Sequence, residues 1–227
     1  MKFRSSIFLL LLLPLIFSCN SEEKKQTTPL PEKGVAVAID HASGFSITDH
    51  GSYMILSIKD PWPDSEKSFR YLLYQADADI PEGIDVEERI QIPVKKIVVT
   101  STTHIPSLET LGEENSLIGF PGLQYISSEK TRQRIAEGKL RELGKNEDIN
   151  TEILLELRPD LVIGFAVDGS NSSFNTIAKS GIPVVYNSDW TESSPLGKAE
   201  WIKFFGAFYN KLEEATEFFE EVEKEYL

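Results

Sequence analysis

The chain has 227 residues and a formal net charge of −13, because 36 acidic side chains stand against 23 basic ones. This negative charge repels phosphate backbones and excludes nucleic acid as a partner. Cys19 is the only cysteine, which excludes an internal disulfide framework.

The first 18 residues have the composition of a signal peptide. Lys2 and Arg4 give a basic start, and residues 7–17 are almost all apolar, in a run too short to span a bilayer comfortably. Ile16-Phe17-Ser18-Cys19 resembles the lipobox of bacterial lipoproteins, in which the cysteine is acylated and becomes the mature N-terminus. The resemblance implies a cell-envelope protein held to a membrane through Cys19. The alternative is an ordinary secretory signal with an incidental cysteine.

A polar tether and a group of strands follow. Residues 19–34 show no apolar pattern, which predicts a flexible tether. Within residues 35–94, strands are predicted at 45–48, 53–58 and 69–74, and we interpret them as a small antiparallel β addition. His41 and His50 lie in polar turns without a partner at metal-ligand spacing, so we expect both at the surface.

Strands and helices alternate from residue 95 to residue 209. This order predicts an α/β fold with a doubly wound, mostly parallel sheet and right-handed crossovers. The expected strands are 97–100, 117–120, 161–165 and 182–186, and the expected helices are 106–111, 128–143, 150–157 and 174–178.

The stretch from Asn150 to Phe165 carries the clearest local signals. Asn150 offers a side-chain oxygen to the free amides of a helix start, and Pro159 ends the helix. Residues 161–165 are nearly all apolar, which is typical of a central parallel strand covered on both faces.

The last part of the chain predicts two amphipathic helices. The first covers residues 196–208, and the second starts near Leu212 and continues to Leu227 without a capping signal.

Ligands of such sheets bind at the carboxyl ends of the strands. Aromatic and polar side chains gather after the four predicted strands, a mixture suited to a sizeable ligand. The candidate ligand-binding residues are Thr102, Thr103, His104, Phe120, Tyr125, Phe165, Asp168, Asn171 and Trp190.

Signals for catalysis are weak. No glycine-rich phosphate loop follows the first predicted strand, no G-x-S-x-G elbow occurs, and His104 has no second histidine near it in sequence. We therefore expect no catalytic residue, no metal site and no cofactor. The alternative is an enzyme, such as a hydrolase, in which Asp168 and Asp189 would come close enough to act as a pair of carboxylates.

A longer motif resembles a known family. Gly144, Asn150-Thr151-Glu152 and Leu157-Arg158-Pro159-Asp160-Leu161-Val162-Ile163 match the G…N-x-E…L-x-P-D-L-V-I signature of ABC-transporter solute-binding proteins for iron siderophores, haem and cobalamin. The resemblance covers about residues 95–227. It implies the first of two α/β lobes, an iron chelate or corrinoid as ligand, and an inner-membrane ABC permease as partner.

The same resemblance assigns two further roles. The glutamate of N-x-E, here Glu152, is implied to contact the permease, while a simple capping role is the alternative. Residues 210–227 are implied to begin the helix that joins the lobes, so the second lobe is expected to be missing. The distinct alternative function is a lipid-anchored surface interaction module that works without a transporter.

Overall fold

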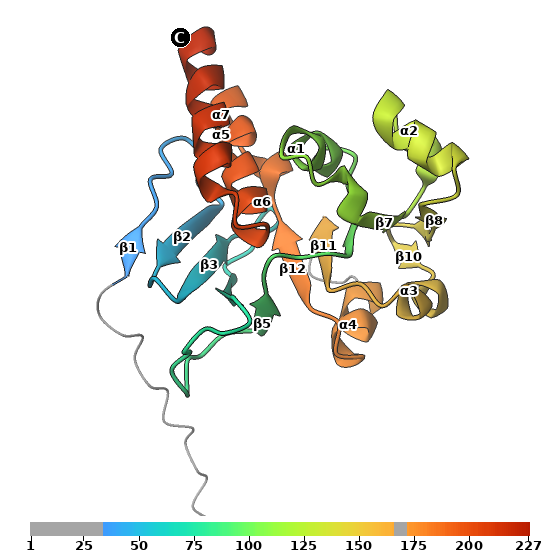
Figure 1. Ribbon diagram of the computed structural model, residues 1–227, viewed down its shortest axis with the longest axis horizontal. Helices are drawn as coiled ribbons and strands as arrows, with labels where there is room; N and C mark the ends of the chain where they lie inside the picture. Colours follow the sequence, from blue (N-terminus) through green and yellow to red (C-terminus); the bar gives the residue numbers. More distant parts are fainter. Residues whose placement is uncertain (1–33, 166–171) are drawn as a thin grey trace, which may run out of the picture.

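Two β-sheets lie side by side in the computed structural model, which describes residues 34–165 and 172–227 (Figure 1). The first sheet has the strand order β1-β2-β3-β4-β5, and its first three pairs are antiparallel. Its strands are β1 (Val35–Ala36), β2 (Phe45–Asp49), β3 (Tyr53–Lys59), β4 (Ser68–Tyr74) and β5 (Glu88–Gln91). The predicted antiparallel strands are confirmed. The β4–β5 pair is parallel, because residues 75–87 carry the chain back to the end at which β4 began.

The second sheet is parallel throughout and has the order β12-β11-β6-β7-β8. Its strands are β6 (Ile97–Val99), β7 (Leu117–Phe120), β8 (Arg141–Glu142), β11 (Leu161–Phe165) and β12 (Val184–Asn187). The predicted α/β class with a mostly parallel sheet is therefore confirmed. β11 was predicted as the central strand, but β6 holds that position and β11 lies next to it, with neighbours on both sides.

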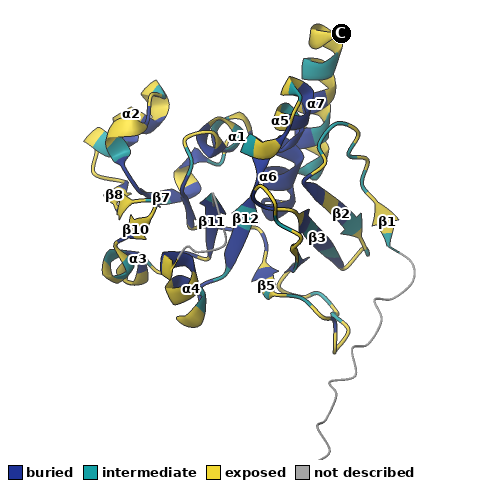
Figure 2. Ribbon diagram, turned by 180° about the vertical axis from the view of Figure 1, so that it is seen from behind, coloured by how far each residue is buried: buried dark blue, intermediate teal, exposed yellow. Residues whose placement is uncertain are grey.

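Helices cover both faces of the parallel sheet. Val98 and Val162 pack in one apolar cluster with Leu154 and Phe174, whereas the next residues along each strand, Val99 and Ile163, belong to a second cluster. This alternation follows from the two-residue period of a strand. Figure 2 shows the resulting buried strands between more exposed helices. The helices are α1 (His104–Thr110), α2 (Glu129–Ala136), α3 (Thr151–Leu157), α4 (Ser172–Lys179), α5 (Pro195–Glu200), α6 (Ile202–Phe208) and α7 (Leu212–Tyr226).

Helix α3 begins and ends at the capping residue and the proline that the sequence predicts. The side-chain oxygen of Asn150 accepts a hydrogen bond from the backbone N–H of Ile153 at 3.1 Å. At the other end, Arg158 takes a left-handed conformation with φ 50° just before Pro159. A capping side chain and a proline therefore confine the helix to the predicted residues.

Two predicted helices are longer than the helices that the structure contains. The helix expected over residues 128–143 ends at Ala136, because Gly138 adopts φ 71°, and the chain then forms β8 and a short hairpin of β9 (Gly144–Lys145) and β10 (Asp148–Ile149). The helix expected over residues 196–208 is divided into α5 and α6 at Trp201. The Trp201 indole N–H donates to Glu192 at 3.1 Å, which fixes this residue against the segment before α5.

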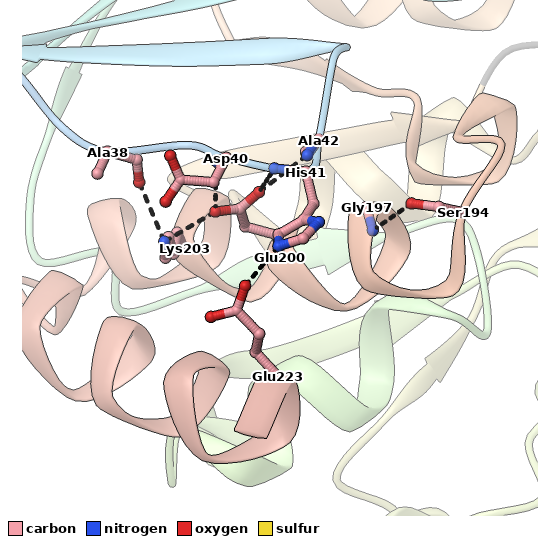
Figure 3. Close-up of polar contacts among 9 residues, drawn as sticks. All are labelled: Ala38, Asp40, His41, Ala42, Ser194, Gly197, Glu200, Lys203 and Glu223. Atoms are coloured by element: carbon pink, nitrogen blue, oxygen red, sulfur yellow. Dashed lines mark hydrogen bonds and ion pairs between the residues drawn. The ribbon is translucent and has the colours of Figure 1, made fainter. Parts of the chain in front are cut away.

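A buried carboxylate joins the β addition to the C-terminal helices. The side chain of Glu200, 0% exposed, accepts hydrogen bonds from the backbone N–H groups of Asp40, His41 and Ala42 at 3.0, 2.7 and 2.8 Å (Figure 3). The ammonium of Lys203, 2.8 Å from Glu200, balances its charge. The segment before β2 is therefore held by ionic and backbone contacts as well as by apolar packing.

His41 does not lie free at the surface, so that prediction was wrong. Its Nε2 atom lies 2.5 Å from a carboxylate oxygen of Glu223 on α7, and its ring packs beside Phe219 (Figure 3 shows the pair with Glu223). The β addition and the parallel sheet also share one apolar core, which includes Phe45 and Leu56 on one side and Ile97 and Phe204 on the other.

Candidate ligand-binding site

The carboxyl ends of β6, β7, β11 and β12 lie at one edge of the parallel sheet, because all four strands run in the same direction. The segments that follow them carry the aromatic residues that the sequence singled out. The rings of Phe165 and Trp190 are in contact, with centroids 5.5 Å apart at an angle of 68°. Side chains separated by many residues in the chain are thus brought to one rim.

The first hollow at this rim has a volume of about 510 Å³, and we call it the β7–β11 hollow. Of the predicted residues it contains Thr102, Phe120, Tyr125 and Phe165. Tyr125 is 72% exposed, while Phe120 is only 2% exposed and forms part of the floor. The other lining residues are Thr100, Ser101, Pro121, Gly122, Gln124, Gly144, Lys145, Asn146 and Glu147.

Hydrogen bonds fix the wall of the β7–β11 hollow. The backbone N–H of Phe165 donates to the Thr100 hydroxyl at 2.8 Å, and the Asn146 side-chain amide donates to the Phe165 carbonyl at 3.2 Å. These bonds hold the ends of β6 and β11 and the β9–β10 turn together.

Glu142 at the end of β8 organises the other wall. Its carboxylate accepts hydrogen bonds from the backbone N–H groups of Gly122, Leu123 and Gly144 at 2.8, 2.9 and 2.9 Å. Burial raises the pKa of this carboxyl, but the backbone hydrogen bonds outweigh it and hold the pKa below its usual value. Glu142 therefore acts as an ionised brace for the turn that leads to Tyr125.

The second hollow has a volume of about 420 Å³ and lies between α1 and α7, so we call it the α1–α7 hollow. Of the predicted residues it contains Thr103 and Trp190. The remaining lining residues are Pro106, Ser107, Thr110, Asp189, Lys198, Ala199, Ile202 and Phe218. The predicted set is thus divided between two neighbouring hollows, which share no lining residue.

His104 is not a polar contact at the rim, and its expected placement in a surface loop was wrong. It is the first residue of α1 and is 0% exposed, with its ring packed against Phe205 at 5.5 Å. Burial lowers the pKa of His104, while the nearby Asp189 and Asn187 side chains act in the opposite direction. Because α1 begins earlier than the sequence indicated, this residue turns into the core rather than toward a ligand.

Several predicted positions lie outside the described residues: Asp168, Asn171 and Cys19. The alternative approach of Asp168 to Asp189 therefore also lies outside the described residues. Within residues 34–165 and 172–227, no group of three or more His, Cys, Asp or Glu side chains is arranged to hold a metal ion. In the same ranges, no helix combines the length and the apolar character needed to cross a bilayer.

Glu152 lies in the first turn of α3 and is exposed. It forms no ion pair with another residue that the structure describes. A carboxylate in this position is favoured by the helix dipole and remains accessible to a partner.

Sequence reasoning missed part of both hollows. Lys145, Asn146 and Glu147 were overlooked, because the helix expected up to residue 143 concealed the turn that carries them. Gly144, with φ 85°, was the available signal for that turn. Phe218 belonged to a recognised helical pattern, but the pattern alone does not say which apolar residue lines a hollow.

Comparisons with known proteins identify the family of the chain. A family model described as "Periplasmic binding protein" matches residues 97–227. Two uncharacterized lipoproteins of Methanocaldococcus jannaschii are each 26% identical to the chain, over 224 residues (90% of this chain, 54% of the relative) and 209 residues (90% and 51%). The chain thus spans about half the length of the curated relatives it matches.

Two solved structures also resemble this fold. The petrobactin-binding protein of Bacillus subtilis has a TM-score of 0.48 and 15% identity, covering 75% of this chain and 50% of that one. A periplasmic heme binding protein of Pseudomonas aeruginosa has a TM-score of 0.47 and 20% identity, covering 58% and 44%. Since the family model matches more than half of the residues, the chain belongs to the periplasmic binding protein family.

Proposed function

We propose that this protein is the substrate-binding component of an ABC importer. It captures an iron chelate, either a siderophore or haem, or cobalamin, and delivers it to a membrane permease. The observation that supports this proposal best is the convergence of Phe120, Phe165 and Trp190 at the carboxyl edge of one parallel sheet. Family membership supports a solute-binding role in general.

The cargo rests on the β7–β11 hollow in this proposal. A volume of about 510 Å³ lies within the range of small-molecule sites and accepts one face of a large ligand. Tyr125 is the exposed aromatic contact, and Thr102 supplies a hydroxyl to the same hollow. Asp168 and Asn171 stay predicted contacts, whereas the buried His104 is removed from the set.

The membrane permease is contacted through Glu152. Its carboxylate is exposed and carries a charge that no neighbouring described residue neutralises, so an arginine of the permease can pair with it. Acylation at Cys19 holds the protein in the cell envelope in this proposal, and residues 19–34 serve as the tether.

Tryptophan fluorescence tests the cargo. Trp190 lies at the rim, while Trp62 and Trp201 are 8% and 2% exposed, so quenching through direct contact with the ligand acts mainly on Trp190. We expect saturable quenching by one of three ligand classes: haem, ferric siderophores or cobalamin. The proposal is contradicted if none of the three binds.

Tyr125→Ala tests where the cargo binds. The loss of an aromatic contact worth about 0.5–1.5 kcal/mol weakens affinity by about three- to tenfold. Tyr226→Ala is a matched control, because Tyr226 is also exposed, at 59%, but lies on α7 away from the lining. Equal effects of the two substitutions would remove the β7–β11 hollow from the proposal.

Glu152→Arg tests the permease contact. We expect it to abolish uptake of the cargo by cells while leaving cargo affinity unchanged, because it reverses a charge outside both hollows. Glu213→Arg is the control, since Glu213 is also an exposed first-turn glutamate, in α7. Normal uptake by the Glu152→Arg variant would show that this residue does not contact the permease.

A further inference from the structure

Residues 43–44 of the β addition contact the segment that carries Trp190. The match to the family model begins at residue 97 and does not include strands β1 to β5. Residues 188–192 follow β12 and contain the short 3-10 helix η3 (Asp189–Thr191), with Trp190 at its centre. A contact between the two segments therefore joins the β addition to the rim of the parallel sheet.

Glu192 makes most of this contact. It directly follows η3 and is 6% exposed. Its Oε1 atom accepts hydrogen bonds from the backbone N–H groups of Ser43 and Gly44 at 2.8 and 2.9 Å, and its Oε2 atom accepts one from the Ser43 hydroxyl at 3.1 Å. The Trp201 indole also donates to Oε1. Hydrogen bonds to a carboxylate are stronger than those between neutral groups, so they fix Glu192 against the residues before β2.

Gly44 packs against the residue on the other side of η3. A Cβ atom at this position would lie 2.8 Å from the Ser188 hydroxyl oxygen, closer than such atoms approach in proteins. Ser188 is 0% exposed, and its carbonyl accepts the backbone N–H of Thr191 at 3.0 Å. Ser188 precedes η3 and Glu192 follows it, so residues 43–44 contact both ends of this short helix.

The position of Trp190 depends on these two ends. A helix of three residues closes too few hydrogen bonds to be stable by itself. Tertiary contacts at Ser188 and Glu192 therefore decide where the Trp190 ring lies relative to the Phe165 ring, whose centroid is 5.5 Å away.

We propose that the β addition positions the ligand rim, with Glu192 as the residue that links it to Trp190. Glu192 is not among the described residues that line either hollow, so it acts through η3 and not by touching the cargo. The role of Trp190 as a cargo contact rests on the proposed function. The positioning of Trp190 is a property of the protein without cargo, so the two are tested separately.

Glu192→Ala tests the link by NMR in the full chain without cargo. The indole N–H groups of the three tryptophans give separate signals, and the signal that is missing in Trp190→Phe belongs to Trp190. We expect this signal to move in Glu192→Ala, because the end of η3 loses its bonds to Ser43 and Gly44. Glu192→Gln keeps an oxygen in the place of Oε1, which accepts most of the hydrogen bonds, so it keeps the native signal.

Gly44→Ala disturbs the same contact from the side of the β addition, because its Cβ atom pushes Ser188 aside. We expect the Trp190 signal to move in this variant as well. Gly44→Ala therefore provides the test if Glu192→Ala does not fold.

Glu200→Ala is the matched control. It releases residues 40–42 of the same segment, but its side chain does not bond to residues 43–44, so the Trp190 signal stays at its native position. A native Trp190 signal in folded Glu192→Ala, or in Gly44→Ala should Glu192→Ala not fold, would overturn the positioning. Equal shifts in Glu192→Ala and Glu200→Ala would overturn it too.

Titration with haem, ferric siderophores and cobalamin measures the consequence for binding. For the ligand that the native chain binds, we expect Glu192→Ala to weaken affinity about three- to tenfold, the factor for one aromatic contact, and Glu192→Gln to restore it. If the native chain binds none of them, the proposed function fails, while the NMR result still decides the positioning. Unchanged affinity in a variant whose Trp190 signal moves would refute the effect on binding.

Discussion

Replacing Glu200 by alanine is the sharpest test of how the β addition is held. The carboxylate accepts three backbone hydrogen bonds from residues 40–42 and one from Lys203, and it is fully buried. Its removal leaves three N–H groups without an acceptor. It also leaves the Lys203 ammonium, whose side chain is 3% exposed, with the Ala38 carbonyl and the Phe219 ring as its remaining contacts.

The expected loss of stability is about 3–5 kcal/mol, the usual cost of removing one partner of a buried ion pair. Each orphaned N–H alone costs about 1–3 kcal/mol, but water entering the vacated space satisfies part of them, so the costs do not add. A typical domain is stable by only about 5–15 kcal/mol. Glu200→Ala therefore removes a large share of the free energy of unfolding.

Urea unfolding followed by circular dichroism measures this loss. The control is Glu220→Ala on α7, an exposed position where we expect a change within about 0.5 kcal/mol. Glu200→Met combined with Lys203→Met restores part of the stability lost in Glu200→Ala, because no buried charge is left unpaired, although the amides of residues 40–42 still lack their acceptor. A loss below about 1 kcal/mol for Glu200→Ala would refute the reasoning.

The pH dependence gives a second measurement on the same residue. Burial raises the pKa of Glu200, but the hydrogen bonds from Lys203 and residues 40–42 outweigh it and lower the pKa. The stabilisation is therefore fully present above the ordinary glutamate value of 4.5 and is lost as the pH falls through the lower folded value. Glu200→Ala lacks this contribution, so its stability falls less steeply in acid than that of the native chain.

Two further predictions concern the rim and the addition. Glu142→Ala removes the acceptor of the Gly122 and Leu123 amides, so we expect the hydrogen exchange of these amides, measured by NMR, to become about tenfold faster. Unchanged exchange rates would show that Glu142 does not stabilise this turn. Gly44→Ala places a Cβ atom 2.8 Å from the Ser188 hydroxyl, so we expect a loss of about 1–3 kcal/mol, read as a lower melting temperature. An unchanged melting temperature would show that the neighbouring segment moves aside freely.

The sequence predicted much of the fold because its signals act over a few residues. Helix α3 follows from Asn150 and Pro159, and strand β11 from its unbroken apolar run. The antiparallel strands β2, β3 and β4 and the parallel strands β6, β7, β11 and β12 were likewise recognised from short patterns of apolar residues and turns, whereas β8 was not. Where a local signal was misjudged, as at Gly138, the predicted element was wrong in length rather than in kind.

The position of His104 shows where local reasoning fails. A histidine between a polar loop and a helix has no sequence feature that decides whether its ring faces solvent or Phe205. The decision depends on where α6 packs, and α6 lies about a hundred residues further along the chain. Thr102 and Thr103 lie in different hollows for the same reason, because elements far away in the sequence form the other walls.

The sequence by itself determined the class of fold, the edge of the sheet at which a ligand is expected and the helix start that carries Glu152, since each depends on neighbours in the chain. Only the tertiary structure decided that the rim divides into two hollows and that Glu200 and Glu223 hold the segment before β2. The contacts of Glu200 and Glu223 join residues more than 150 positions apart, such as His41 and Glu200, and no local pattern encodes such a contact. Burial determines how much these contacts contribute to stability, because an unpaired charge in the core costs far more free energy than one in water.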